Sequence, residues 1–357
     1  MTDKALLDKE LSAQVLTVGE YFKDGSHGGI ASVLRSYSDC FGEFKFIPSS
    51  RKLTLSDKLR YDLGSLFRLG WKLLCDRQIR IVHIHTAAGG SFTKHMYYAR
   101  LARIMGRKVV LHCHASSFKD WYSALPERKA GKVLSFINSL DCLVVLSASW
   151  KEYFLSIGVS HDVPVVLNNI TPYPALAGTK DNGDRLKLLF LGEIGQRKGV
   201  FDLLEAMSLV RCGAVLDIGG NKMEAELRER ISSLGLSDRV VFHGFVSGTL
   251  KQELLAEADV FVLPSYNEGL PISILEAMSY GCAIISTPVG GIPEVVRGNG
   301  ILVKPGDAAA IAGAIDALAD ASVRSVMGEC SREIVKSYYP GSVMASLRSI
   351  YLNVLAE

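Results

Sequence analysis

The chain has 357 residues, of which 48% are hydrophobic and 22% charged, and its net charge is +3. This length suits about two domains, and the composition is that of a globular protein able to bury large cores. No apolar run approaches the ~20 residues needed to cross a bilayer, so no transmembrane helix is expected. Nucleic acid is not an expected partner.

The seven cysteines are scattered and form no C-x-x-C pair. Such a set suits a reducing compartment better than a disulfide framework. The segment from Met1 to Gln14 is charged and lacks the apolar core of a signal peptide. We therefore expect a cytoplasmic protein, either free or peripheral on the cytosolic face of the inner membrane.

Charge is distributed unevenly along the chain. Residues 1–175 hold 23 Lys and Arg against 15 Asp and Glu, a balance of +8, whereas residues 176–357 hold 17 against 22, a balance of −5. The basic half would attract an anionic membrane surface or an anionic acceptor. Ordinary surface variation explains the asymmetry equally well.

Apolar runs alternate with helical patterns through the first half of the chain. A glycine-rich turn, Gly25 to Ile30, follows the first expected strand. Gly28 and Gly29 would let backbone N–H groups approach a phosphate, although a plain tight turn is the alternative. The expected strands of this half are 13–18, 44–47, 81–85, 108–112, 143–146 and 163–167.

The region from Arg51 to Arg80 is basic and amphipathic, and it is expected to be helical after Ser56. Such a helix could lie on a membrane surface. A helix packed on the sheet with a solvated basic back is slightly favoured, because every sheet-packing helix is amphipathic.

Four histidines gather at the ends of two successive expected strands: His83, His85, His112 and His114. A zinc site is conceivable, since alternate strand residues share a face. No acidic residue or ordered cysteine pair accompanies the histidines, so sugar contact or packing is preferred. His114 lies farthest past its strand and is the one expected to face a cleft.

The segment after residue 167 is poor in hydrophobic residues and rich in turn formers, as in a linker. We expect an N-terminal domain at 1–170, a linker at 171–184 and a C-terminal domain at 185–340. The final helix, 341–357, is expected to return to the N-terminal domain.

The second half repeats the alternation, with strands expected at 186–191, 214–218, 240–242, 260–263, 283–286 and 300–303. Arg197 and Lys198 lie in a strand-to-helix turn with glycines on either side. Their charges could clamp a diphosphate at the helix start. An exposed basic turn is the alternative.

The stretch from Pro264 to Met278 places two carboxylates, Glu268 and Glu276, eight residues apart around the start of a helix. The helix is expected from Pro271 to Tyr280. The turn follows the carboxyl end of a strand, where open α/β sheets bind ligands. By spacing alone, one capping and one solvated glutamate would be the simpler interpretation.

The residues around these glutamates favour a functional role. Glu268-Gly269-Leu270-Pro271, Glu276-Ala277-Met278 and the run from Thr287 to Glu294 resemble the E-x7-E signature of retaining glycosyltransferases of family 4. The resemblance implies an α/β protein of GT-B fold, in which two Rossmann-like doubly wound domains face each other across a cleft. It also implies transfer of a hexosyl unit from a UDP- or GDP-linked sugar.

The resemblance assigns roles to individual residues. Glu276 would take the ribose hydroxyls, and Lys198 the diphosphate. His114, Glu268 and Lys198 form the catalytic set implied by the resemblance. The other donor contacts are Gly28 and Gly29 in the first domain, Phe245 or Val246 near the base, and the amides of Gly269, Leu270, Pro271 and Ile272 around the sugar and phosphates.

One position departs from the family pattern. Many relatives carry an arginine where this chain has Glu193, so Arg197 is expected to supply the second cation. No Asp-x-Asp acts as a metal motif, and neither metal nor cofactor is expected. The implied path is front-face attack with retention, with Glu268 as a covalent nucleophile the less favoured alternative.

The acceptor is indicated by the stretches His83 to Lys94 and Leu111 to Phe118, which look like those of bacterial transferases that build surface polysaccharides on lipid carriers. A lipid-linked saccharide of exopolysaccharide, capsule or O-antigen synthesis is the leading hypothesis. A soluble acceptor is the second. A catalytically silent sugar-nucleotide-binding protein, and an epimerase or hydrolase of similar fold, remain further alternatives.

Overall fold

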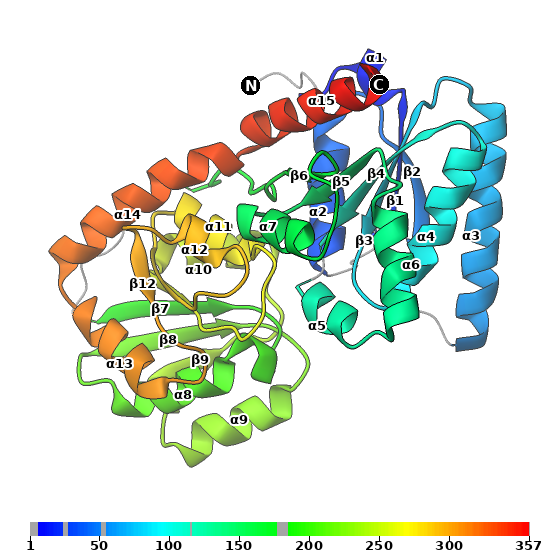
Figure 1. Cartoon of the computed structure of the whole chain (residues 1–357). Coiled ribbons are helices and arrows are strands. Elements are labelled where there is room, and N and C mark those ends of the chain that lie inside the picture. Colours follow the sequence, from blue (N-terminus) through cyan, green and yellow to red (C-terminus); the bar gives the residue numbers. More distant parts are fainter. Residues whose placement is uncertain (1–5, 24–27, 51–54, 115, 177–184, 357) are drawn as a thin grey trace. The chain divides into compact units, whose positions relative to one another are not determined.

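The computed structural model describes residues 6–23, 28–50, 55–114, 116–176 and 185–356. These residues form two compact units, one from residues 1–170 with 340–357 and the other from residues 171–339. Each unit is built around a sheet of its own (Figure 1). Residues 25–27 of the glycine-rich turn and 177–184 of the expected linker lie outside the described residues.

The N-terminal unit contains a six-stranded parallel sheet in the order β2-β1-β3-β4-β5-β6. Parallel neighbours need crossover connections, and helices supply them. The strands are β1 (Val15–Glu20), β2 (Lys45–Ser50), β3 (Ile81–Thr86), β4 (Lys108–Cys113), β5 (Cys142–Val145) and β6 (Pro164–Val166). The helices are α1 (Lys9–Ser12), α2 (Gly29–Cys40), α3 (Leu55–Cys75), α4 (Gly90–Ile104), α5 (Phe118–Ser123), α6 (Glu127–Ile137), α7 (Ala148–Ser156) and α15 (Pro340–Ala356).

The two faces of this sheet differ in chemistry, because successive strand residues point to opposite faces. One face is apolar: Val82 and Ile84 of β3 join the core formed with α3 and α4. The other face is polar and aromatic, where side chains of β3 and β4 meet α2 and α15. Its members are His83, His85, His112, Tyr37 and Tyr351.

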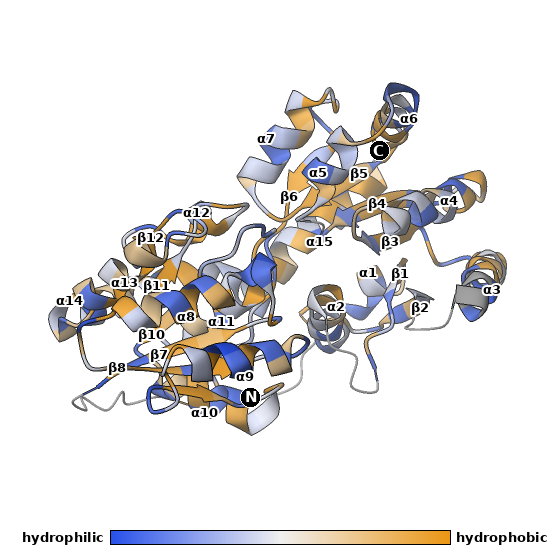
Figure 2. Cartoon of the chain, turned by 90° about the horizontal axis from the view of Figure 1, so that it is seen from below, coloured by the Kyte–Doolittle hydropathy of each residue, from blue (hydrophilic) through white to orange (hydrophobic). Residues whose placement is uncertain are grey.

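The C-terminal unit repeats the architecture with the strand order β12-β11-β10-β7-β8-β9. Its strands are β7 (Leu186–Leu191), β8 (Ala214–Gly219), β9 (Val240–Phe242), β10 (Val260–Leu263), β11 (Ala283–Ser286) and β12 (Gly300–Leu302). Its helices are α8 (Val200–Leu209), α9 (Glu224–Ser233), α10 (Gly248–Glu257), α11 (Ile272–Ser279), α12 (Ile292–Val295), α13 (Ala308–Ala317) and α14 (Ala321–Val335), and η1 (Gln196–Lys198) and η2 (Lys336–Tyr338) are 3-10 turns. Strand β10 is buried at every position, as expected of a strand covered on both faces. Strands of both units show hydrophobic segments in Figure 2.

The predicted fold class, two doubly wound parallel α/β domains, is confirmed. The helix at the E-x7-E stretch starts one residue later than predicted, since Pro271 has an extended ψ of 121° and caps the helix instead of entering it. In the described part of the chain, no helix combines the length and apolarity needed to cross a membrane.

Candidate functional site

The loop after β10 carries Glu268, whose side chain is buried beside a lysine. Oε1 of Glu268 lies 2.5 Å from Nζ of Lys198 and accepts a hydrogen bond of 2.7 Å from the Ser265 hydroxyl. Glu268 as a whole is 6% exposed. A carboxylate this buried needs such partners, because an unpaired charge is costly away from water. The contacts hold the carboxylate in place at the carboxyl edge of the sheet.

Two glycines allow this loop to pack closely against its neighbours. Gly199 and Gly290 have φ values of +70° and +56°, which favour glycine. A Cβ at Gly199 would overlap the carbonyl oxygen of Pro264, and one at Gly290 would overlap that of Glu268. The backbone around Glu268 is therefore clamped from two sides.

Glu276 lies on α11 and forms a second ion pair. Its Oε1 is 2.6 Å from Nζ of Lys251 on α10. Sequence reasoning did not single out Lys251 or Ser265. Ser265 stands inside the motif stretch and could have been noticed, whereas Lys251 belongs to no pattern of spacing that marks it.

Arg197 and Glu193 also lie near this loop. Nη1 of Arg197 donates to the carbonyl oxygen of Asn267 at 3.2 Å, and its Nη2 is 4.0 Å from Oε2 of Glu193. Glu193 also pairs with Nζ of Lys222 at 2.7 Å. The Arg197–Glu193 pair is half-exposed, so solvent screens it. Arg197 thus approaches the motif loop through its guanidinium.

The other residues expected to contact the donor differ in their exposure and in what their backbone can donate. Phe245 is exposed, while Val246 is buried and lies close to Gly219. Gly269 and Leu270 are buried ahead of α11. Pro271 carries no N–H group, so it cannot donate to a phosphate as the sequence analysis expected of the whole run from Gly269 to Ile272.

The candidates of the N-terminal unit lie at the start of α2 and just after β4. Gly28 caps α2 in an extended conformation and Gly29 begins the helix. A Cβ on Gly29 would meet nothing within 4 Å, so the chain itself does not demand a glycine there. His114 follows β4, and its Nε2 lies 2.9 Å from Nδ1 of His85.

The histidines gather on one face of the sheet, within the strands as well as at their ends. Burial lowers the pKa of His114 to about 3. Burial, followed by the charge of His114, lowers the pKa of His83 to about 3. These rings are therefore neutral at pH 7.

Comparison with known proteins shows which glycosyltransferases the chain is similar to. Residues 185–321 match the family model of glycosyl transferases group 1. This match covers most of the C-terminal unit. An uncharacterized glycosyltransferase of Methanocaldococcus jannaschii is 28% identical over 299 residues, which cover 76% of this chain and 74% of that protein.

Two further comparisons extend the likeness. The lipopolysaccharide core biosynthesis glycosyltransferase LpsE of Rhizobium meliloti is 28% identical over 63% of this chain and 66% of its own. The structure of Anabaena HepE in complex with UDP and glucose superposes with a TM-score of 0.73 at 16% identity, covering 94% of this chain and 98% of that one. The chain has the GT-B fold, and its sequence is similar to that of a glycosyltransferase of bacterial lipopolysaccharide core synthesis.

Proposed function

We propose that the protein transfers a hexosyl unit, with retention and without a metal ion, from a UDP- or GDP-linked sugar. The observation that carries this proposal is the buried Lys198–Glu268 pair beside the helix that bears Glu276. It brings a cation of the turn η1, suited to a diphosphate, next to a loop and a helix whose carboxylates suit hydroxyl groups. HepE, of the same fold, was solved with UDP and glucose.

The proposed chemistry follows from charge. Cleavage at the anomeric carbon leaves an oxocarbenium-like sugar and a diphosphate whose negative charge grows in the transition state. Cations placed on that diphosphate stabilise the transition state more than the ground state. Lys198 is assigned this role first, and Arg197 the second.

The carboxylates have separate tasks in this scheme. Lys198 and Ser265 both bind Oε1 of Glu268, so Oε2 is the oxygen that a sugar hydroxyl would meet. Glu276 would exchange part of its contact with Lys251 for the ribose hydroxyls. The acceptor hydroxyl would attack from the leaving-group side, and a phosphate oxygen would take its proton. His114, Gly28 and Gly29 are assigned to the sugar and phosphate from the N-terminal unit.

Thermal unfolding with a nucleotide panel tests the donor site. UDP, GDP and ADP, with their sugar conjugates, would be added with and without magnesium. A ligand at 100 times its dissociation constant adds about 2.7 kcal/mol to a folded protein. We expect a magnesium-independent rise in Tm with one nucleotide, lost in Lys198→Ala and Glu276→Ala. Val326→Ser, an exposed position on α14, serves as the control.

Failure of every nucleotide to shift Tm in folded protein would contradict the donor site. A shift with no product from any acceptor would instead favour a silent sugar-nucleotide-binding protein. Product released without an acceptor would favour an epimerase or hydrolase.

For the acceptor we propose a lipid-linked saccharide at an anionic membrane, reached through helix α3. This helix packs on the sheet through Leu69 and Leu73, which are buried. Its outer face combines basic residues, as the sequence favoured, with exposed apolar ones. It carries an apolar stripe at helical spacing, with Phe67 73% and Trp71 62% exposed. The stripe consists of Leu63, Phe67, Trp71 and Leu74.

Basic side chains accompany the stripe. Arg60 and Arg68 of α3 are exposed, and Arg68 lies over the ring of Tyr61 at 5.2 Å. On α4, which packs beside α3, Tyr97 and Ile104 add further exposed apolar surface. Apolar side chains flanked by cations are the composition of an interfacial helix on anionic lipid.

Vesicle sedimentation tests the membrane surface. We expect binding to vesicles containing an anionic phospholipid and weaker binding to neutral vesicles or at high salt. Phe67→Ser with Trp71→Ser should weaken the partition by at least tenfold, since each buried aromatic contributes about 1.5–3 kcal/mol. The control change Val326→Ser, at an exposed position, should leave the partition onto vesicles unchanged. Full solubility together with activity on small acceptors would instead identify a soluble acceptor.

A further inference from the structure

The polar face of the N-terminal sheet holds buried nitrogen atoms without partners. Nε2 of His83, Nε2 of His85 and both ring nitrogens of His112 have no hydrogen-bond partner among the described residues. Buried polar groups are nearly always bonded, and an exception points to a missing water or ion. We propose that His83, His85 and His112 bind one Zn²⁺ ion.

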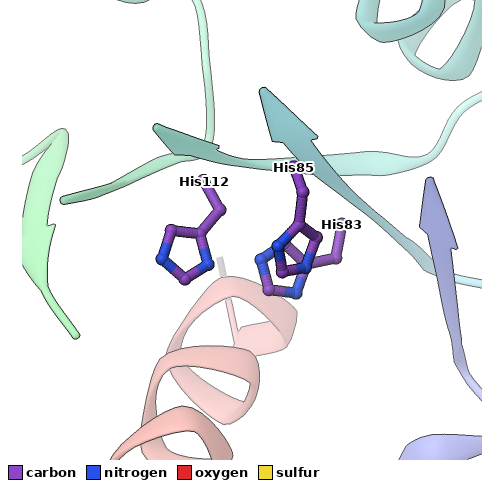
Figure 3. Close-up of side chains that lie close together, drawn as sticks. All are labelled: His83, His85 and His112. Carbon is purple, nitrogen blue, oxygen red and sulfur yellow. The ribbon is translucent and has the colours of Figure 1, made fainter. Parts of the chain in front are cut away.

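The three rings are placed for a shared ligand. They project from neighbouring strands β3 and β4 toward helix α15 (Figure 3). One ligand nitrogen from each ring lies within 4.8 Å of those of the other two. Tetrahedral zinc with Zn–N bonds of 2.0–2.1 Å brings its nitrogens to about 3.3 Å apart. The rings of His83 and His112 are 6° from parallel, so binding would require these imidazoles to rotate toward the ion.

The hydrogen bonds of these rings match those of metal ligands. A ligating histidine usually binds the metal with one nitrogen and donates the other N–H to a partner. Nδ1 of His83 is 2.6 Å from the Tyr351 hydroxyl, and Nδ1 of His85 is 2.9 Å from Nε2 of His114. In both residues Nδ1 is engaged and Nε2 is the nitrogen left over, so Nε2 is assigned to the ion.

The protonation state of the three rings suits metal binding. Burial holds the pKa of His85 and His112 well below the usual value, so the rings are neutral ligands at pH 7. Imidazole nitrogens suit zinc among the common divalent ions. A water molecule would fill the fourth position and ionise near pH 7, which offsets one unit of charge.

Two hydroxyl groups on the same face fit that water. Thr17 pairs in register with His83 across β1 and β3, and the Tyr37 ring centroid lies 5.3 Å from that of His85. Oγ1 of Thr17 and Oη of Tyr37 are buried and have no partner in the described part of the chain. A zinc-bound water would give these hydroxyls a hydrogen-bond partner.

Ion binding would reach beyond the core. It would connect β3 and β4 and, through the His83–Tyr351 contact, helix α15. With Nε2 of His85 on the ion, its Nδ1 carries the proton and donates to Nε2 of His114. That bond leaves the N–H of His114 on Nδ1, so the ion would also determine the tautomer of His114.

Metal analysis of tag-free, full-length protein tests the proposal. After loading with Zn²⁺ and dialysis, we expect about one zinc per chain and a Tm about 5–10 °C above that of chelator-treated protein. Replacement by Co²⁺ should give the visible absorption of a four-coordinate site. His112→Gln should lose the bound metal. His95→Gln is the matched control, because His95 is equally buried but bonded to Ser49 and Thr86.

The opposite results would overturn the proposal. Zinc below about a tenth of an equivalent with no change in Tm, or equal zinc in His112→Gln, would mean that the nitrogens bond to buried water only. If His112→Gln fails to fold, the cobalt spectrum and the zinc-dependent Tm of the unmodified protein still decide. Neither readout depends on glycosyl transfer, so the result is independent of the proposed activity.

Discussion

Lys198 and Glu268 are 70 positions apart in the sequence, yet Nζ and Oε1 lie 2.5 Å apart in the C-terminal unit. The contact joins the 3-10 turn η1 to the loop after β10. Both side chains are largely buried, so each group depends on the other for a partner. Lys198 is therefore expected to contribute both to the stability of the fold and to the proposed catalysis. A variant at Lys198 must distinguish the loss of stability from the loss of activity.

Lys198→Met should lower kcat by about 10²–10³-fold, since a fixed cation on the leaving group is lost. It should also destabilise the protein, because Glu268 is left buried without its cation. Lys198→Met combined with Glu268→Gln should recover much of the stability and none of the activity. Steady-state kinetics and urea unfolding on the same samples would measure both. Recovery of activity with stability would show that Lys198 is only structural.

Gly290→Ala should disrupt the motif loop, whereas Gly313→Ala should not. A Cβ at Gly290 would overlap the Glu268 carbonyl oxygen at a φ of +56°, so we expect a loss of about 3 kcal/mol or more. Gly313 lies within α13 with open space around it, and alanine there should stabilise by up to about 1 kcal/mol. Denaturant midpoints of the two variants would compare them. Equal midpoints in the two variants would contradict the claim that the loop around Glu268 requires a glycine at position 290.

Glu276→Gln should weaken nucleotide binding by about tenfold while leaving the fold intact, because the amide keeps the shape but loses the charge on which hydroxyl donors act. Lys251→Ala should change nucleotide affinity by less than about threefold, since its ion pair with Glu276 is partly solvated. Isothermal titration with the nucleotide found in the panel would distinguish the two. A larger effect at Lys251 would assign the phosphate contact to that lysine.

His95 should make the protein less stable in mild acid. Burial, with the charge of Lys94 as the second cause, lowers the pKa of His95 to about 3 from about 6.5 in the unfolded chain. The unfolded chain then binds more protons between these values, so stability falls as the pH drops below 6.5 and levels off near 3. The contribution at pH 5 is about 2 kcal/mol.

Unfolding of the unmodified protein and His95→Gln at pH 7 and pH 5 checks this prediction. The variant should lose about 2 kcal/mol less stability between the two values, and the other histidines are common to both proteins. An equal loss in both would show that His95 is not the group that titrates.

The strands were predictable because their signal is local. A strand covered on both faces is a short hydrophobic run, and the runs at 186–191, 240–242, 260–263 and 283–286 are strands with those same bounds. The loop with Glu268 and the helix with Glu276 follow from the same pattern, since a proline and a glycine mark the ends of that helix. Element order along the chain was therefore enough for the doubly wound fold class.

The partners of the key side chains needed the tertiary structure. Lys251 meets Glu276 because α10 and α11 pack near each other, and nothing in the sequence around Lys251 indicates it. The outer stripe of α3 is exposed because Leu69 and Leu73 face the sheet instead. The helix has two apolar faces, and the periodicity of the sequence does not indicate which of them is buried. His83 and His112 meet because the register of β3 and β4 and the placement of α15 close one face around them. Local pattern determines which element a residue joins, while packing between distant elements determines what its side chain touches.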